Sequence, residues 1–479
     1  MTKQVDYLVV GAGATAMAFV DAVFHESDAT FAIVDRRDAP GGHWNDAYPF
    51  VSLHQPASCY GVASRPLGTG RLDETGYNRG LESLASGIDV ASHFHGFMRD
   101  TLAPSGRVDY YPMTNYEGEG DFVSLLSGQR HHVDATVVVD ATLLETRIPL
   151  THSRSFTVGD EVVCVAPNDL PRLAPSFEHY AVLGGGKTGL DAVLWLLSRH
   201  VAPERITWVI PRDPWMINRA LFQPGLDAFR RVTGAFAAAQ AEAAAGADTL
   251  DDLGERLEAG GVWLRLDPNV WPTMQHCASI TVHELEQARR IDDVVRLGRV
   301  TSIERDRLVL EHGERPVTTR TLFVDCTASA LENAVGGGVP VFGPGYIALQ
   351  MIRLCQPTFS GALIGHIEVA VTDDADKQAL TSAVPMPDTV AGWANAWGIS
   401  TTNERAWLRH PAVRPWLATC RLNPAAAWSH ISADDKAART LLDRVGAHTQ
   451  LATENLRRLT TNQPVGPRQA STFPSGPPA

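Results

Sequence analysis

The stretch that decides the fold is DYLVVGAGATAMAFVDAVFHESDATFAIVDRRDAPGGHW, residues 6–44 of a 479-residue chain. Its apolar run Tyr7–Val10 is followed at once by glycine, as in a buried strand of a parallel sheet. Gly11 permits a tight turn, Gly13 lets the backbone approach a pyrophosphate, and the small Ala16 lets a helix pack closely on the strand. The stretch therefore predicts the strand, glycine turn and helix of a dinucleotide-binding unit.

The residues after this turn complete the unit. The predicted helix begins at Ala14, and the free N–H groups at its start suit a phosphate. A second strand, over residues 30–34, ends in Asp35, whose carboxylate suits a pair of ribose hydroxyls and repels a 2′-phosphate. We expect Asp35 and the neighbouring Arg36 to contact the nucleotide.

A Gly-Gly-x-Trp sequence at residues 41–44 indicates that this nucleotide is FAD. Two glycines soon after the ribose acid let the backbone pass beside the nucleotide and then turn towards a flavin ring. Gly42, His43 and Trp44 are therefore expected beside FAD. An ordinary Gly-Gly turn followed by a core tryptophan is the alternative interpretation.

Length, charge and cysteine usage limit the class of protein. A chain of 479 residues is too long for one core, so two or more domains are expected. The net charge of −13 argues against a nucleic-acid surface and against anionic membranes. No signal peptide or membrane span is visible. The six cysteines form no CxxC pair, which argues against a redox-active dithiol or zinc site and favours a cytoplasmic protein without a metal.

A second glycine turn repeats the pattern after a strand at residues 179–183. The strand that follows its helix, at residues 206–210, leads to Arg212 where the first unit has Asp35. Losing the acid and gaining a cation favours a 2′-phosphate, hence NADPH, with Arg219 as a second positive contact. A solvated arginine at a strand end is the alternative for Arg212. The other residues expected to bind this second dinucleotide are Gly184, Gly186, Lys187, Thr188 and Gly189.

Each unit closes on a strand that ends in Asp-Ala-Thr or Asp-Cys-Thr, which places Thr142 beside the first nucleotide. Two such units imply two dinucleotides. The predicted fold is α/β, with two Rossmann-like dinucleotide-binding domains, one for FAD and one for NAD(P)H, the second inserted in the first. The expected parts are the first part of the FAD domain (1–165), the NAD(P)H domain (175–330) with a helical insertion (about 220–290), a return to the FAD domain with C-terminal helices (331–460) and a disordered tail (461–479).

Together these motifs resemble those of the flavin-dependent monooxygenases with two dinucleotide-binding domains, the class B type. The resemblance covers roughly residues 5–330, and its most discriminating part is the Gly-Gly-x-Trp sequence followed by Tyr48 and Pro49. It implies an enzyme that uses FAD, NADPH and O2 to oxygenate nitrogen, sulfur or a ketone in a small organic substrate through a C4a-(hydro)peroxyflavin. The Phe-x-Gly-x-x-x-His signature of that family is absent, and residues 156–159 are the nearest stretch.

The flavin would carry out the redox chemistry, so the protein must supply hydrogen-bond donors and a pocket that excludes water. His54 and Gln55, just after the Gly-Gly-x-Trp turn, are the catalytic candidates for contacting the flavin edge, and satisfied loop residues are the alternative. The absent histidine signature favours a second class of function, an NAD(P)H-dependent flavoprotein dehydrogenase or reductase that does not activate oxygen. A nucleotide sensor with a degenerate flavin site is a third class, against which the intact glycines count. A homodimer is possible.

Overall fold

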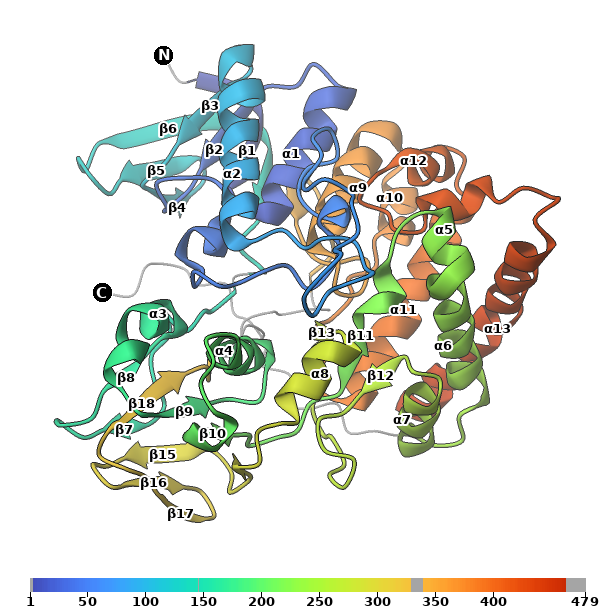
Figure 1. Ribbon diagram of the computed structural model, residues 1–479. Helices are drawn as coiled ribbons and strands as arrows, with labels where there is room; N and C mark the ends of the chain where they lie inside the picture. Colours follow the sequence, from blue (N-terminus) through green and yellow to red (C-terminus); the bar gives the residue numbers. More distant parts are fainter. Residues whose placement is uncertain (1–2, 145, 329–338, 462–479) are drawn as a thin grey trace.

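The chain forms three lobes in this computed structural model, which describes residues 3–144, 146–328 and 339–461 (Figure 1). Two lobes are built on sheets and the third is mostly helical. Among the described residues, no helix is both long and apolar enough to cross a membrane. The expected disordered tail lies outside the described residues, except for Thr461 at its start, which is the last residue of a helix.

The first lobe is a parallel sheet centred on the strand that opens the chain. Strand β1 pairs in parallel with β2 on one side and with β6 on the other, and α1 connects β1 to β2, as predicted. The strand order is β19-β20-β6-β1-β2-β3, and β4 and β5 extend the sheet as a hairpin on β6. Its elements are β1 (Lys3–Val10), α1 (Ala14–Glu26), β2 (Phe31–Val34), α2 (Gly87–Phe97), β3 (Val108–Tyr111), β4 (Thr114–Gly118), β5 (Asp121–Ser124), β6 (Arg130–Asp140), β19 (Phe342–Gly343), β20 (Tyr346–Ala348) and α9 (Pro357–Ala370).

The chain returns to this lobe after completing the second one, which confirms that the second unit is inserted in the first. Tyr346 of β20 pairs in parallel with Val138 of β6, and α9 then packs on α1. The two helices approach so closely that a Cβ atom at Gly361 would lie 2.3 Å from the carbonyl oxygen of Thr15. A glycine is therefore required in α9 where it crosses the start of α1.

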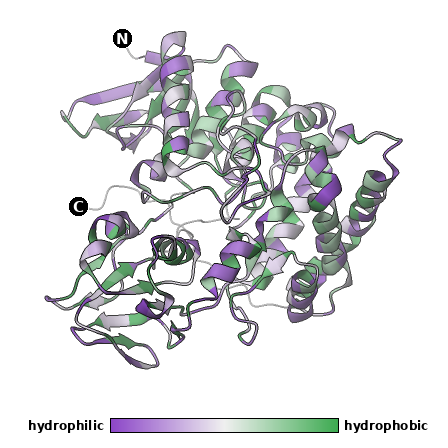
Figure 2. Ribbon diagram, viewed as in Figure 1, coloured by the Kyte–Doolittle hydropathy of each residue, from purple (hydrophilic) through white to green (hydrophobic). Residues whose placement is uncertain are grey.

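The second lobe repeats the architecture of the first. Its parallel sheet has the order β14-β10-β9-β18-β8, and a smaller sheet, β17-β16-β15-β7, lies beside it. Strands β9, β10 and β18 are coloured as hydrophobic in Figure 2, as expected for strands covered on both faces. The elements are β7 (Thr157–Val158), β8 (Cys164–Val165), α3 (Leu170–Leu173), β9 (His179–Leu183), α4 (Lys187–Ser198), β10 (Ile206–Val209), α8 (Val282–Ala288), β14 (Val294–Val295), β15 (Val300–Ile303), β16 (Arg307–Leu310), β17 (Gly313–Pro316) and β18 (Thr321–Asp325).

One expected boundary differs from the structure. The sequence-based boundary at residue 165 places residues 157–165 in the first domain, but β7 pairs with β15 and β8 pairs with β18, so both strands belong to the sheets of the second lobe. Each strand contributes only two residues. Such short strands carry no recognisable periodicity, and their pairing is decided by partners far along the chain.

The third lobe combines the predicted helical insertion with the C-terminal helices. A small sheet, β12-β11-β13, packs with α6, α7, α11 and α13 around buried tryptophans, Trp215, Trp263 and Trp393. Two of the helices have side-chain caps: Thr249 caps α7, and Thr281 and Glu284 form a capping box at α8. The elements are β11 (Met216–Asn218), α5 (Leu226–Ala228), α6 (Gly234–Gly246), α7 (Leu250–Ala259), β12 (Trp263–Leu264), β13 (Ser279–Ile280), α11 (Val390–Arg409) and α13 (Lys436–Thr461). The short helices α10 (Asp374–Leu380) and α12 (Val413–Thr419) flank α11 but bury their apolar residues in the core of the first lobe.

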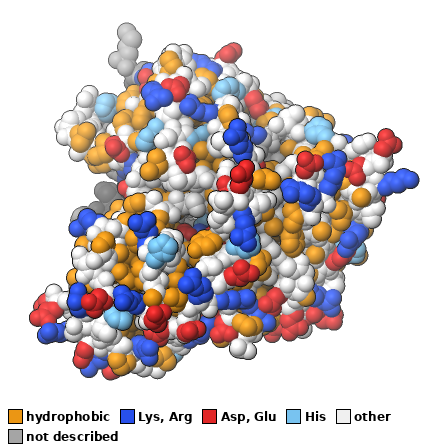
Figure 3. All heavy atoms as spheres, viewed as in Figure 1, with side chains coloured by type: hydrophobic (Ala, Val, Ile, Leu, Met, Phe, Trp, Pro, Cys, Tyr) orange, Lys and Arg blue, Asp and Glu red, His pale blue; other side chains and the backbone are white. Residues whose placement is uncertain are grey.

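Charged side chains cover the outside of all three lobes. On the face seen in Figure 3, Lys and Arg are interspersed with Asp and Glu and do not gather in a patch of one sign.

Candidate functional site

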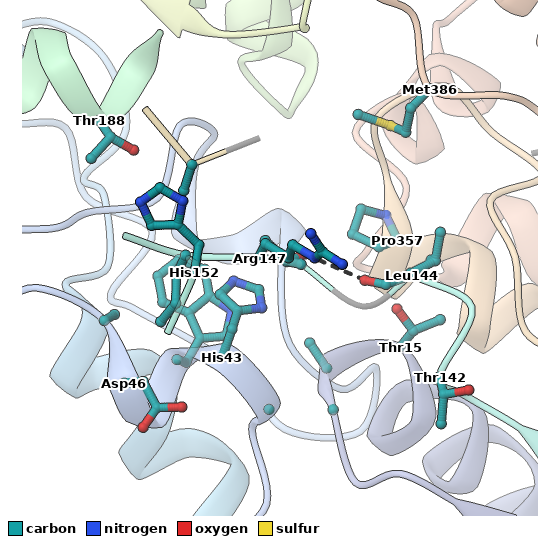
Figure 4. A pocket seen from close by; sticks show the side chains of 18 of the residues that line it. Thr15, His43, Asp46, Thr142, Leu144, Arg147, His152, Thr188, Pro357 and Met386 are labelled. Carbon is teal, nitrogen blue, oxygen red and sulfur yellow. Dashed lines mark hydrogen bonds between the residues drawn. The ribbon is translucent and has the colours of Figure 1, made fainter. Parts of the chain in front are cut away.

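A cavity of about 1810 Å³ lies between the lobes, and both glycine turns line it. Seventeen of the predicted site residues line this one cavity, and only Gly189 and Arg219 do not. Figure 4 shows Thr188 on one side of the cavity and Pro357 and Met386 on the other, with Arg147 between them. Within the described ranges, no group of three or more potential metal ligands converges.

The first glycine turn leaves open space in front of α1. Gly11 has a φ of +99°, a conformation that favours glycine, and its N–H donates to the carbonyl of Val34 at 2.8 Å. Gly13 begins α1 without a side-chain cap, and a Cβ atom there would meet no atom within 4 Å. The first N–H groups of the helix therefore face a space that a pyrophosphate fits.

The predicted ribose acid is fixed at the edge of this space. Asp35 is only 6% exposed, and its Oδ2 accepts a hydrogen bond of 2.5 Å from the Ala12 N–H. Its Oδ1 accepts another from the Arg37 N–H at 2.7 Å. Both bonds hold the carboxylate as an acceptor beside the turn. The neighbouring Arg36 donates from Nε to Asn115 Oδ1 at 2.7 Å, which ties it to β4.

The Gly-Gly-x-Trp turn lies directly on the first glycine turn. The Gly41 N–H donates to the carbonyl of Ala12 at 2.8 Å, and a Cβ atom at Gly42 would lie 3.1 Å from Gly13 Cα. Both glycines of this second turn have positive φ, 116° and 60°. The backbone of the two turns thus forms one cradle, and side chains in place of these glycines would fill it.

The aromatic residues of this turn have different roles. Trp44 donates from Nε1 to the Tyr60 hydroxyl at 2.9 Å and packs against the core of the first lobe, while also lining the cavity. Burial, together with the nearby charge of Arg37, lowers the pKa of His43 to about 4. His43 is therefore a neutral imidazole near neutral pH.

The structure brings both catalytic candidates to the cavity. The backbone carbonyl of His54 accepts hydrogen bonds from Arg219 Nε and Ser279 Oγ, which fixes the loop against the third lobe. Burial, together with the charges of Lys187 and Arg219, holds the pKa of His54 well below its usual range. Gln55 donates from Nε2 to the carbonyl of Cys59 at 3.2 Å, so its amide is partly committed within its own loop.

The second glycine turn has the same construction as the first. Gly184 has a φ of +127°, and a Cβ atom there would lie 2.5 Å from the carbonyl oxygen of Cys326. A Cβ atom at Gly189 would lie 2.1 Å from the Gly184 carbonyl, so this glycine serves close helix packing without lining the cavity. Gly186 begins α4 uncapped, with nothing within 4 Å of its Cβ position. The start of α4 is therefore a second open phosphate site.

Arg212 lies at the cavity wall, as predicted, but it has protein partners. Its Nη1 donates to Asp388 Oδ1 at 2.9 Å, and its Nη2 donates to the carbonyl of Thr273 at 2.9 Å. Hydrogen bonds from His276 and Arg212 lower the pKa of Asp388 to about 2. Sequence reasoning missed a second cation, Arg299, which lines the same cavity beyond β14, the strand paired with β10.

Arg219 does not have the expected role. Its side chain is fully buried and pairs with Glu284 at 2.9 Å. The guanidinium also donates to Asn78 Oδ1 at 3.0 Å and to two backbone carbonyls. These partners contradict the prediction of a phosphate contact, because the residue follows β11 into the interior and lies away from the cavity. Arg219 instead joins the first lobe to the insertion.

A disulfide also contradicts the argument from the missing CxxC pair. Cys277 and Cys355 are 78 residues apart in the sequence, but they are bonded to each other and both line the cavity. Local spacing carries no signal for a pair that only the tertiary fold brings together. The absence of a CxxC pair therefore does not exclude a dithiol at this site.

Comparisons with known proteins identify relatives in mycobacteria. Proteins of Mycobacterium tuberculosis and Mycobacterium bovis, named only as uncharacterised, are 43% identical to this chain over 422 residues, which is 88% of this chain and 78% of the relative. No protein-family model matches the chain.

The solved structures to which this chain is similar have low sequence identity to it. An oxidised steroid monooxygenase bound to NADP is 13% identical, with a TM-score of 0.46 and coverage of 96% of this chain and 99% of that chain. A cyclohexanone monooxygenase is 12% identical, with a TM-score of 0.44 and coverage of 95% and 99%. The bacillithiol disulfide reductase of Bacillus cereus is 9% identical, with a TM-score of 0.44 and coverage of 77% and 100%.

Proposed function

We propose that this chain, which belongs to the same family as these uncharacterised mycobacterial proteins, is an FAD-dependent monooxygenase that NADPH reduces and that oxidises a small organic substrate. The observation that carries the proposal is the single cavity lined by both open glycine turns. Two dinucleotides held at the two turns would share that cavity. The relatives' names supply no activity, so the support comes from the site and from the sequence motifs.

The first cradle has the donors and the space that FAD requires. The N–H groups that begin at Ala14 would hold the pyrophosphate, and Asp35 would accept from the ribose. The turn at Gly42 would pass beside the nucleotide. When bound, FAD supplies the hydride acceptance and the reaction with O2.

The second cradle would hold NADPH in the same way. The open start of α4 at Gly186 would take the pyrophosphate, and Arg212 and Arg299 would flank a 2′-phosphate. Asp388 partly neutralises Arg212, so Arg299 is the cation that adds most to an NADPH preference. We therefore base the proposed preference for NADPH over NADH on two arginines, Arg212 and Arg299. Arg299 takes the role of second positive contact that the sequence suggested for Arg219, which is buried.

The rest of the cavity wall suits the exclusion of water and the placement of single hydrogen bonds. Its apolar lining includes Leu144, Met351 and Met386. The depressed pKa values keep His43 and His54 neutral, and a neutral imidazole donates from one nitrogen and accepts at the other. His54 can thus donate a hydrogen bond to an oxygen at the flavin edge without bringing a net charge.

A second candidate function is an NAD(P)H-dependent flavoprotein reductase that does not activate oxygen. The specific observation that favours it is the disulfide between Cys277 and Cys355 on the cavity wall, because a disulfide is a two-electron acceptor. The absence of the Phe-x-Gly-x-x-x-His signature favours it as well.

Oxygen mixing after anaerobic reduction separates the two functions. The FAD-loaded protein is reduced with NADPH and mixed with oxygenated buffer while the spectrum and the release of H2O2 are recorded. A spectral species distinct from both reduced and oxidised flavin, with little H2O2, supports the monooxygenase. Direct return to oxidised flavin with one H2O2 released per turnover favours the reductase.

A matched pair of variants tests the role of the neutral imidazole. In a monooxygenase, His54→Ala is expected to shorten the lifetime of the oxygen-dependent species and to raise H2O2 release. Gln55→Ala is expected to have the smaller effect, because the Gln55 amide is engaged with Cys59. Equal effects of both variants would remove His54 from the proposed role.

A further inference from the structure

We propose that Cys277 and Cys355 are a redox-active pair on the cavity wall, whose disulfide is reduced by NADPH through the bound flavin. The inference rests on the proposed binding of FAD and NADPH and is independent of oxygen activation. It assigns a second redox centre to the same site.

The pair joins two lobes at the cavity. Cys277 precedes β13 in the insertion, whereas Cys355 lies between β20 and α9 of the first lobe. Their Cα atoms are 6.5 Å apart, within the ordinary range for a disulfide, and both residues are half-buried. The bond is therefore at a lobe boundary and open to the cavity on one side.

Short stretches of chain connect each cysteine to the expected flavin position. Cys355 is two residues before Pro357, the first residue of α9, and α9 packs on α1 next to the first glycine turn. Cys277 is two residues before Ser279, whose hydroxyl donates to the carbonyl of His54. The disulfide thus lies on the same wall as the residues that would surround the flavin.

The other four cysteines have different surroundings. Cys59, Cys164, Cys326 and Cys420 are free, and burial raises the pKa of each thiol, to about 12 for Cys59, Cys164 and Cys420. Thiols of such high pKa react slowly, because the thiolate is the reactive form. These cysteines are therefore suitable as internal controls, and the proposed chemistry is confined to Cys277 and Cys355.

Two glutamines close to the cysteines in the sequence each have one amide atom without a partner among the described residues. Gln275 is fully buried and uses Oε1 to accept from the Cys277 N–H at 2.8 Å, while its Nε2 has no hydrogen-bond partner. Gln356, the neighbour of Cys355, has a buried Oε1 without a partner. A donor on Gln275 and an acceptor on Gln356 are thus unpaired, and these two residues lie within two positions of the cysteines in the sequence. A buried polar atom without a partner is available to a newly formed thiol or thiolate.

The proposed step balances in atoms and electrons. The S–S bond breaks as it takes up two electrons and two protons, and each sulfur becomes a thiol. NADPH supplies a hydride and solvent supplies one proton, so that NADPH, H+ and one disulfide give NADP+ and two thiols. A flavin bound at the first cradle would carry the two electrons from NADPH to the disulfide without net change.

The test counts electrons and labels thiols in the FAD-loaded, full-length protein. NADPH is added anaerobically in steps while the flavin absorbance is followed, and free thiols are then alkylated and located by mass spectrometry. The wild-type protein is expected to consume about two equivalents of NADPH and to become alkylated at both Cys277 and Cys355. Cys277→Ser and Cys355→Ser are each expected to consume about one equivalent.

Cys164→Ser is the matched control, because Cys164 is a half-buried free thiol outside the pair, and it is expected to behave as the wild type. Flavin that is reduced while the wild-type Cys277–Cys355 peptides remain disulfide-linked would overturn the inference and leave the proposed function intact. Free thiols at both positions after oxidation with glutathione disulfide would also overturn it. Flavin that NADPH cannot reduce would instead overturn the proposed function. Alkylation of Cys277 and Cys355 in the wild-type protein tests the proposal even if a variant does not fold.

Discussion

Tyr48 donates a hydrogen bond from its hydroxyl to Asp191 Oδ2 at 2.7 Å and so joins the two nucleotide-binding lobes. Tyr48 follows the Gly-Gly-x-Trp turn of the first lobe, and Asp191 lies in α4 of the second. Lys187, at the start of α4, pairs with the other carboxylate oxygen of Asp191. This network therefore fixes the second phosphate site relative to the first cradle.

Removing the Tyr48 hydroxyl is expected to affect electron transfer as well as stability. Tyr48→Phe should lower the free energy of unfolding by about 1 kcal/mol, the usual contribution of one hydrogen bond, and should slow the reduction of the flavin by NADPH. Urea unfolding and stopped-flow reduction measure the two effects. Tyr180→Phe is the control, since the Tyr180 hydroxyl donates to carbonyls within the second lobe. Equal slowing in both variants would contradict a role in joining the lobes.

Arg219 is expected to matter for stability and not for cofactor choice. Arg219→Met leaves Glu284 buried without its cation, so the free energy of unfolding should fall by about 3–5 kcal/mol. The ratio of kcat/KM for NADPH to that for NADH should stay unchanged. A shift of that ratio, with stability preserved, would restore the phosphate role that the sequence suggested.

The cations at the cavity wall are expected to show the opposite behaviour. Arg299→Ala should lower the NADPH-to-NADH ratio of kcat/KM by about 10-fold or more, the loss of one charged hydrogen bond, with little change in stability. Arg212→Ala should lower the ratio less, because Asp388 already pairs with Arg212. Steady-state kinetics with both cofactors measure this, and an unchanged ratio in both variants would remove the proposed preference for NADPH.

Acid is expected to destabilise the protein through a buried histidine. His93 Nε2 accepts a hydrogen bond from the Val62 N–H at 3.0 Å, and burial lowers the pKa of His93 to about 4. Because the unfolded chain binds this proton first, the stabilisation is complete above about pH 6.5 and is lost as the pH falls towards 4. The loss is about 3 kcal/mol at most.

A substitution isolates that contribution. Glutamine can accept the same hydrogen bond without titrating. Between pH 6.5 and 4, the unfolding free energy of His93→Gln should therefore fall less steeply with pH, by a slope that corresponds to about one proton fewer taken up on unfolding. His132→Gln is the control, since Asp121 and Asp134 raise the pKa of the exposed His132 and its removal should not flatten the acid limb. An unchanged slope in His93→Gln would contradict the assignment.

Local chemistry was the part that could be predicted from the sequence. The strand, turn and helix around Gly11 and Gly184 depend on conformations that neighbouring residues dictate. The return of the chain to the first sheet at β20 could also be predicted, because the first domain has to be completed after a unit that is inserted in it.

Tertiary relationships were the part that could not be predicted. Arg212 and Arg219 are seven residues apart, but one lines the cavity and the other is buried, because β11 carries the chain inward between them. The contact of Cys277 with Cys355, and the pairing of β7 and β8 with the second lobe, join segments far apart in the sequence. The sequence around each of these cysteines and strands contains no signal that identifies its partner.

The most direct test of the central claim uses the two open glycine positions, where the protein itself leaves room for a side chain. Gly13 and Gly186 both have ordinary φ values, −69° and −79°, and their Cβ positions meet no atom within 4 Å. Gly13→Val and Gly186→Val should therefore fold as the wild type does, and only a bound dinucleotide would be displaced. Bound FAD and its anaerobic reduction by NADPH are measured in all three proteins. The account predicts stoichiometric FAD in the wild type, no FAD in Gly13→Val, and FAD in Gly186→Val that dithionite reduces but NADPH does not. Stoichiometric FAD that NADPH still reduces in Gly13→Val would contradict it.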